Sequence, residues 1–282
     1  MNPNILISNP QEFQRKLNLI MSWGSQHFHV IADFDRTLTK AFVEWEFRAS
    51  LESVLEKWWY LWTDYSSRSK ANFDKYHPIE IDPTISLEFK KSAMLERRTN
   101  QFQAMIECGL TKNIIQEAMK SDTIVFRNWY EEFFDILLEK DIPLIIFSAS
   151  WLWYFAIHSL LQNNNKLNPN INIISNSFIR DESGKAIWIK KPIIHSFNKD
   201  ETAVRDFPIY EEIKHRKNII LLGDSLGDVD MANWFDYENI LKIWFLNKEI
   251  DKNIENYKKS FDMLILNDWP MDEINSILQK IN

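Results

Sequence analysis

The sequence predicts an α/β protein with a parallel sheet, helices on both faces of the sheet and a mainly helical insertion. Two continuous apolar segments, 143–147 and 218–223, are typical of strands that are buried on both faces. They alternate with segments whose apolar residues recur at helical spacing, which is the pattern of strands joined by crossover helices. A long helical stretch, 42–119, interrupts this alternation after the first strand, and we expect it to form a cap domain.

The N-terminal part of the chain holds a single expected strand among helical segments. We expect helices at 11–23, 42–62, 84–108 and 111–119, a strand at 29–32, a loop at 64–74 and an extended segment at 76–83. The last of these is expected to be extended because it contains Pro78 and Pro83, and proline disfavours helix in the residue before it.

Strands and helices alternate through the remainder of the chain. We expect strands at 143–147, 172–175, 218–223, 241–245 and 263–266, a hairpin over 178–189, and helices at 126–140, 151–161, 201–215, 250–257 and 271–280. Residues 1–41 and 120–282 are therefore assigned to one core domain, and 42–119 to the cap.

Composition and charge narrow the class of protein. The net charge of −7 argues against binding of a nucleic acid polymer, whose phosphates require a basic surface. Cys108 is the only cysteine, so no intrachain disulfide forms, which fits a reducing compartment. No signal peptide is evident, and no apolar run approaches the ~20 residues that span a bilayer. We expect a cytoplasmic protein with no membrane partner.

Asp33 and Asp35 stand one residue apart where the strand 29–32 ends, and Thr37 and Thr39 follow them. A pair of carboxylates held this close is costly unless a cation lies between the charges. Mg²⁺ is a natural partner, because it takes oxygen ligands and keeps positions open for phosphate oxygens. The first carboxylate could then attack phosphorus while the second transfers protons. The alternative is a solvated pair of carboxylates that caps the next helix.

Three predicted strands end in small polar or acidic residues: Asp33 with Asp35, Ser148, and Asp224 with Asp228. In open parallel sheets, ligands bind at the carboxyl ends of the strands, so these residues converge on one edge. Asp224 could bind Mg²⁺ directly, with Asp228 supporting it from a second layer. Ser148 and the backbone N–H groups after it could bind phosphate oxygens. A lysine is still needed to offset the charge of nucleophile and phosphate.

These residues, in this order, resemble the haloacid dehalogenase superfamily of aspartate-nucleophile phosphatases, which implies a Rossmann-like core with an inserted cap. The downstream half is more similar to the pyrimidine 5′-nucleotidase family, which includes cytosolic 5′-nucleotidase III. The resemblance covers most of the chain from Asp33 onward. The similar segments are 79–83, 146–149, 195–200, 218–232, 241–243 and 246–247.

The resemblance implies a role for each residue of the site. Asp33 would be the nucleophile and Asp35 the acid/base, with Lys199 completing the catalytic group. The acidic metal site would comprise Asp33, Asp35 through its backbone carbonyl, Asp224 and Asp228. Thr37, Ser148, Ala149 and Lys199 would contact the phosphate, and Glu80 would face the nucleobase from the cap. Lys190 and Lys191 compete with Lys199, and His195 is expected to be a packed side chain rather than a ligand.

Two segments depart from the family pattern. Ser148-Ala149-Ser150 stands where a serine-alanine-glycine triplet is expected, and two tryptophans follow it closely. The segment 40–76 lacks the cysteine- and histidine-containing stretch associated with base recognition in the animal enzymes. Most of its tryptophans are expected to pack within the cap or between cap and core, and one could stack on a base: Trp45, Trp58, Trp59 and Trp62.

The sequence thus predicts a Mg²⁺-dependent phosphomonoesterase that forms an aspartyl-phosphate and hydrolyses a nucleoside 5′-monophosphate, with pyrimidine favoured. One alternative is a phosphatase for another small phosphate, such as phosphoserine or a sugar phosphate. The other is a non-catalytic nucleotide-binding protein. The complete set of acidic residues argues against the second alternative, because a binding protein needs no nucleophile.

Overall fold

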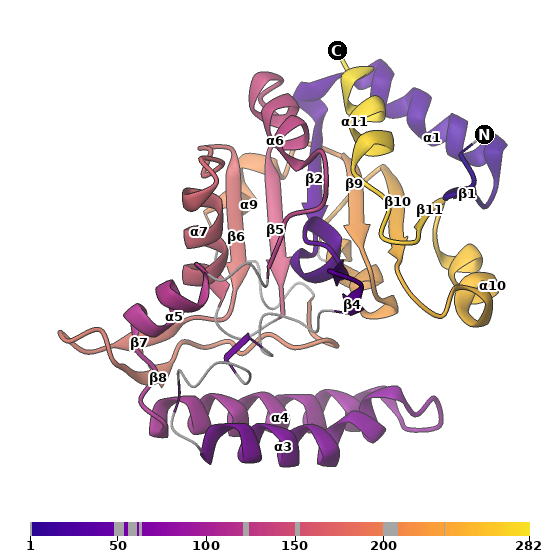
Figure 1. The fold of residues 1–282 in the computed structure, drawn as a ribbon. Helices are drawn as coiled ribbons and strands as arrows, with labels where there is room; N and C mark the ends of the chain where they lie inside the picture. Colours follow the sequence, from indigo (N-terminus) through magenta and orange to yellow (C-terminus); the bar gives the residue numbers. More distant parts are fainter. Residues whose placement is uncertain are drawn as a thin grey trace.

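A computed structural model describes residues 2–47, 54–55, 61, 64–120, 124–149, 153–199, 208–233 and 235–282. These residues build a 7-stranded sheet in the order β1-β11-β10-β9-β2-β5-β6 (Figure 1). Neighbouring strands run parallel, apart from β1, which pairs antiparallel with β11 at one edge. The described part therefore has the predicted α/β architecture.

The strands of this sheet include every strand predicted for the core apart from the hairpin 178–189, which forms a separate 2-stranded sheet. They are β1 (Ile5–Ile7), β2 (Phe28–Ala32), β5 (Leu144–Ser148), β6 (Ile171–Ser175), β9 (Asn218–Gly223), β10 (Asn239–Leu246) and β11 (Met263–Leu266). Every residue of β2, β5 and β9 is buried. The edge strand β1 was not predicted, because three residues are too few to show a period.

Helices cover both faces of the sheet. One face packs against α1 (Pro10–Trp23), α6 (Tyr130–Glu139), α7 (Trp153–Asn163) and α11 (Asp272–Gln279). The other packs against α9 (Ile209–Ile213), the turn η3 (Leu226–Ala232) and α10 (Ile250–Ser260), while the turn η1 (Ser25–His27) leads into β2. Along β2, Val30 faces the first layer of helices and Ile31 the second. The central strands β2, β5 and β9 are mostly apolar because both of their faces are covered.

Two helices lie side by side beyond the carboxyl ends of the strands, α3 (Asp64–Ile81) and α4 (Leu87–Glu107) (Figure 1). A buried polar seam joins them. Nε2 of Gln101 donates to the hydroxyls of Tyr65 at 3.0 Å and Ser69 at 2.7 Å. Farther along, Nδ2 of Asn72 donates to Oε1 of Gln101 at 2.8 Å. Hydrogen bonds between buried partners hold this pair of helices in one register.

The helix pair is linked to the sheet by α5 (Lys112–Ala118) and by the hairpin of β7 (Phe178–Arg180) and β8 (Ala186–Ile189). Phe102 of α4 packs edge to face on Phe178 of β7, with 5.5 Å between the ring centroids. Thr111 accepts a hydrogen bond from the backbone of Ile114 and caps α5, as predicted.

The chain leaves the core for the helix pair and returns to it at one place. Thr39 and Phe126 form an antiparallel bridge. Beside it, the N–H of Lys40 donates to Val125 O and that of Arg127 donates to Leu38 O, each at 2.9 Å. This crossing lies close to the predicted boundaries of the cap, 42–119, although the division into domains stays a prediction.

The start of the cap differs from the prediction of a helix over 42–62. Residues 42–47 form a hairpin of β3 (Phe42–Val43) and β4 (Glu46–Phe47), and most of 48–62 lies outside the described residues. The hairpin turn places Glu44 and Trp45 at φ values of 52° and 66°. Neither residue type favours this left-handed conformation, so the sequence carries no turn signal here.

The segments 64–74 and 76–81, predicted as a loop and extended chain, belong to the single helix α3, which contains Pro78. Tyr76 on this helix is buried against Ala93 and Met94 of α4. Packing and the polar seam therefore outweigh the local effect of the proline, as tertiary contacts commonly do.

Within the described residues, no helix combines the length and the apolar character required to cross a membrane. The cytoplasmic location expected from the composition stays a prediction.

Candidate active site

Three neighbouring strands end at one edge of the sheet, as predicted. Because β2 lies between β9 and β5, Asp33 follows the central strand, with Asp224 after β9 on one side and Ser148 at the end of β5 on the other. The N–H of Asp33 donates to Leu222 O at 2.9 Å, which extends the pairing with β9 by one residue. The backbone of Asp33 is thereby fixed, and its side chain is buried.

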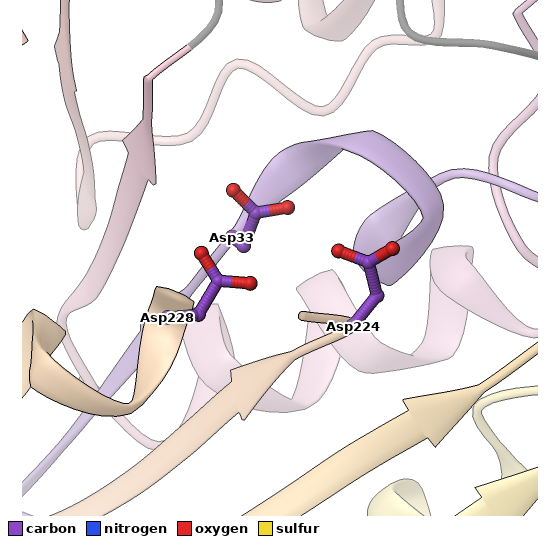
Figure 2. A group of neighbouring side chains, drawn as sticks. All are labelled: Asp33, Asp224 and Asp228. Atoms are coloured by element: carbon purple, nitrogen blue, oxygen red, sulfur yellow. The ribbon is translucent and has the colours of Figure 1, made fainter. Parts of the chain in front are cut away.

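Lys199 joins two carboxylates that come from different parts of the chain. Its Nζ donates to Oδ1 of Asp33 and to Oδ1 of Asp228, at 2.6 Å in both cases. Figure 2 shows these two carboxylates side by side. Lys199 is only 5% exposed, and burial alone would lower its pKa, but the two carboxylates outweigh burial and raise the pKa. Lys199 therefore remains a cation.

Opposing effects act on the pKa of Asp33. Burial raises the pKa of Asp33 well above its ordinary value, the ammonium group of Lys199 opposes this, and the nearby carboxylates add to it. A further cation beside Asp33 would lower the pKa and favour the ionised carboxylate that a nucleophile requires.

Asp228 is held by Ser225, three residues before it in the chain. Its Oδ2 accepts hydrogen bonds from the N–H of Ser225 at 3.1 Å and from Oγ of Ser225 at 2.8 Å. These contacts form a capping box at the start of η3. Since Oδ1 accepts from Lys199, both carboxylate oxygens of Asp228 already have donors.

Asp224 lies on the far side of Asp33 from Ser148, next to a cation. Its Oδ2 is 3.8 Å from Nη1 of Arg36. Burial raises the pKa of Asp224 to about 7, although Arg36 acts in the opposite direction. The preceding Gly223 has no room for a side chain, because a Cβ there would lie 2.4 Å from the ring of Trp244. Nε1 of Trp244 donates to Ser225 O at 3.0 Å and fixes this turn.

The acidic cluster fits the predicted metal. Asp33, Asp224 and Asp228 each offer an oxygen atom within 4.8 Å of the others (Figure 2). Carboxylate oxygens are the ligands that Mg²⁺ prefers. These three carboxylates face two cations of the protein, Lys199 and Arg36. A divalent cation would offset the remaining negative charge and favour the ionised carboxylates.

Arg127 is completely buried and holds the loop that follows Asp33, η2 (Phe34–Leu38). Its guanidinium donates to Thr37 O at 2.9 Å, to Arg36 O at 2.5 Å and to Oδ1 of Asp268 at 2.8 Å. Burial lowers the pKa of Arg127 to about 10, with Asp268 opposing the change. Because its partners are backbone carbonyls of η2, Arg127 fixes the path of the chain past Asp35.

The predicted phosphate-binding residues lie along the same edge. Thr37 is buried, and its Oγ1 has no hydrogen-bond partner within the described ranges. Ser148 and Ala149 are buried at the end of β5. Asn176, which follows β6, donates to Ala149 O at 3.4 Å and pairs with both backbone groups of Ile194 at 2.8 and 2.9 Å.

Glu80 lies on the last turn of α3 rather than on an extended segment. Its Oε2 accepts from Nη1 of Arg97 at 2.8 Å, and its Oε1 accepts from Oγ of Ser196 at 2.9 Å. Burial alone would raise the pKa of Glu80, but Arg97 and Arg98, together with hydrogen bonds from Ser196 and His77, lower it. Both oxygens of this carboxylate thus contact the protein, and its role toward a nucleobase stays a prediction.

The remaining candidate residues from the sequence differ in their burial. Lys190 and Lys191 are exposed, whereas Lys199 is buried against Asp33. His195 is buried and its Nδ1 accepts from the N–H of Phe197 at 3.2 Å, as expected of a packed residue. The departures from the family pattern at Ser150, Trp151, Trp58, Trp59 and Trp62 lie outside the described residues.

Sequence reasoning missed Arg36, Arg127 and Asn176. Asn176 follows a predicted strand, so the rule that identified Ser148 also applies to it. Arg127 lies in a loop before α6, and only its burial reveals its role.

Solved structures define the class of protein. The crystal structure of phosphoserine phosphatase in apo form matches with a TM-score of 0.51 and 15% identity, over 90% of this chain and 98% of that one. The crystal structure of cytosolic 5′-nucleotidase IIIB bound to cytidine matches with a TM-score of 0.87 and 26% identity, over 99% and 94%. The fold is therefore that of the haloacid dehalogenase-like hydrolases.

A family model described as Pyrimidine 5′-nucleotidase (UMPH-1) matches residues 36–282. The 7-methylguanosine phosphate-specific 5′-nucleotidase A of Xenopus laevis is 31% identical over 276 residues, which cover 98% of this chain and 94% of that protein. The 7-methylguanosine phosphate-specific 5′-nucleotidase of Homo sapiens is 29% identical over 282 residues, 100% of this chain and 93% of the relative. The chain belongs to the pyrimidine 5′-nucleotidase (UMPH-1) family and is a 5′-nucleotidase, a phosphoric monoester hydrolase.

Proposed function

We propose that this 5′-nucleotidase hydrolyses a nucleoside 5′-monophosphate in two steps, through an aspartyl-phosphate on Asp33. The observation that carries the proposal is the bridge from Lys199 to Asp33 and Asp228. An anionic nucleophile and an anionic phosphate repel each other, and a buried ammonium group 2.6 Å from the nucleophile offsets that repulsion. The fixed backbone of Asp33 holds its oxygen in one position for in-line attack.

Asp33, the backbone carbonyl of Asp35 and Asp224 would hold Mg²⁺. When bound, this ion would neutralise charge on the phosphoryl oxygens. Asp228 would orient the site, because Lys199 and Ser225 already donate to its two oxygens.

In the first step, an oxygen of Asp33 forms a bond to phosphorus, and the ribose oxygen leaves with a proton from Asp35. In the second step, Asp35 takes a proton from a water molecule that attacks the same phosphorus. The bond to Asp33 breaks, and phosphate is released. The hydroxyl of Thr37, with Ser148, Ala149 and Lys199, would contact the phosphoryl oxygens.

The comparisons point to two different nucleobases for the substrate. The description of the family favours a pyrimidine, and the solved relative is bound to cytidine. The relatives from Xenopus laevis and Homo sapiens are named for 7-methylguanosine phosphate, which makes that nucleotide the second candidate. Phosphoserine and sugar phosphates remain the alternatives from outside the nucleotides.

The test is phosphate release from CMP, UMP, 7-methylguanosine monophosphate, phosphoserine and glucose 6-phosphate, with Mg²⁺ and with excess chelator. We expect turnover of at least one nucleotide, dependent on Mg²⁺ and abolished in Asp33→Asn, a variant that keeps the size of the side chain. Turnover of phosphoserine or the sugar phosphate alone would refute the nucleotide substrate. Full activity of Asp33→Asn would refute the covalent route.

A further inference from the structure

Arg36 lies in the loop η2 and its side chain points toward Asp224. Its Nη1 lies 3.8 Å from Oδ2 of Asp224, and the two side chains are 29% and 16% exposed. Lys199 pairs with the other two carboxylates of the cluster, Asp33 and Asp228. Each of the three carboxylates that could hold a metal ion is thus paired with a cation of the protein.

The backbone fixes the direction of the Arg36 side chain. Arg36 has φ 65° and ψ 4°, in the left-handed region that residues other than glycine rarely adopt. Its carbonyl accepts from Nη2 of Arg127 at 2.5 Å and from Nδ2 of Asn247 at 3.1 Å. Its N–H donates to Oγ1 of Thr39 at 2.9 Å. Three hydrogen bonds therefore hold Arg36 in a strained conformation that aims its side chain at Asp224.

The guanidinium also borders a pocket of about 170 Å³, which Asp224 and Tyr257 help to line. The guanidinium lies 5.0 Å from the ring centroid of Phe47, and Nζ of Lys248 lies 4.1 Å from the same centroid. Nε of Arg36 is buried and has no hydrogen-bond partner in the part of the chain that the structure describes. The guanidinium is therefore incompletely bonded where it stands, and there is space beside it.

We propose that Arg36 is a positioning residue that competes with the divalent cation for Asp224 and so sets the affinity of the metal site. The inference rests on the proposed metal-dependent function. An ion bound between Asp33 and Asp224 would repel the guanidinium, so the pair of Arg36 and Asp224 loosens when the ion binds and forms again when it leaves. The adjacent pocket receives the displaced guanidinium.

The competition is weak enough to be reversible. Pairs of partly exposed charges at this separation contribute little, and salt screens them. Lys199, by contrast, is buried at 2.6 Å from its partners and stays in place. Arg36 is therefore the cation that metal binding displaces.

The test is calorimetric titration of the chelator-treated, full-length protein with Mg²⁺ alone, without substrate. We expect Arg36→Met to bind Mg²⁺ roughly fivefold more tightly than the wild type, the factor for loss of a partly exposed ion pair. Lys248→Met is the matched control, because it removes a cation from the same pocket and from the same ring without touching Asp224; its affinity should stay within about twofold of the wild type. Raising the salt concentration should narrow the difference between Arg36→Met and the wild type.

Unchanged or weaker binding in Arg36→Met would overturn the proposal, as would an equal gain in Lys248→Met. If Arg36→Met does not fold, Arg36→Gln takes its place with the same expectation. Asp224→Asn should abolish the binding signal; a signal that survives this change arises elsewhere and would also overturn the proposal. Since no nucleotide is present, failure of the proposed substrate leaves these outcomes unaffected.

Discussion

Oγ of Ser196 donates a hydrogen bond to Oε1 of Glu80 at 2.9 Å, and this contact joins the loop that carries Lys199 to the end of helix α3. The next residue, Phe197, packs on the cluster of Tyr76, Ala93 and Met94 between α3 and α4. The position of the helix pair is therefore coupled to the position of the lysine that contacts Asp33.

Phe197→Ala should weaken this coupling without removing any group that touches the phosphate. We expect kcat/KM for the preferred nucleotide to fall roughly ten- to hundredfold, because small misplacements of a catalytic group have effects of this size. Steady-state kinetics provide the measurement. Phe89→Ala is the control, since Phe89 is an exposed aromatic on α4. Equal kinetics in the two variants would show that the contact of Phe197 is only structural.

Glu80→Ala distinguishes contact with the base from support of the cap. Both carboxylate oxygens contact protein groups, so we expect kcat/KM to fall for a nucleotide and for a small aryl phosphate alike, by ~1–3 kcal/mol in transition-state free energy. Parallel kinetics on the two substrates test this. A loss confined to the nucleotide would instead support the base-facing role that the family resemblance implies.

Lys199→Met should be far more damaging than Lys190→Met or Lys191→Met, which alter exposed lysines. Loss of the charge-assisted contact to Asp33 should cost ~1.5–3 kcal/mol or more in transition-state free energy, measured as a fall in kcat/KM. The two exposed lysines should behave like the wild type in a phosphate-release assay. A large loss in either of them would mean that Lys199 is not the phosphate-binding lysine.

Gly223→Ala should destabilise the fold, because the added Cβ would lie 2.4 Å from the ring of Trp244. We expect a loss of ~1–3 kcal/mol in the free energy of unfolding, measured by denaturant titration. In a Trp244→Leu background the same substitution should cost less, since the obstructing ring is gone. Additive effects of the two changes would show that the clash with Trp244 is not the cause.

His29 should make stability depend on pH. Burial lowers the pKa of His29 to about 3 from 6.5, and its Nδ1 donates to Arg216 O at 3.0 Å. The unfolded chain therefore binds a proton below pH 6.5 that the folded chain does not. Above pH 6.5 His29 is neutral in both states and takes nothing from the free energy of unfolding. As the pH falls from 6.5 toward 3, protonation of the unfolded chain lowers the free energy of unfolding, by ~2 kcal/mol at pH 5.

This contribution can be isolated by measuring unfolding free energies at pH 7 and pH 5. His29→Gln should reduce the loss between the two pH values by that amount, whereas His215→Gln, at an exposed position, should not. The raised pKa values of Asp33 and Asp224 make the fold more stable as the pH falls, but they do so equally in the wild type, His29→Gln and His215→Gln. An unchanged pH dependence in His29→Gln would contradict the prediction.

The core and the acidic site could be predicted because their signals are local. A mostly apolar strand that ends in a polar residue locates Asp33, Ser148 and Asp224, and the parallel order of the strands brings them together. Lys199 shows no periodic signal in its loop, so only the family resemblance identified it, and the structure then placed its Nζ 2.6 Å from Asp33.

The parts that the sequence did not reveal depend on contacts between distant residues. The helix α3 runs through Pro78 because Tyr76 and the polar seam pack on α4. Arg127 acts only because the fold buries it against the loop after Asp33 and against Asp268. Neither effect can be inferred from the local pattern of residues.

The bridge between Thr39 and Phe126 has a consequence for how such an enzyme can diversify. A segment whose two ends are adjacent can grow, shrink or be exchanged without changing the distance between its attachment points. Asp33 lies before this crossing, and the strands that lead to Ser148 and Asp224 lie after it. We expect residues 40–125 to behave as an exchangeable unit, provided that a graft keeps the hydrogen bond between Ser196 and Glu80.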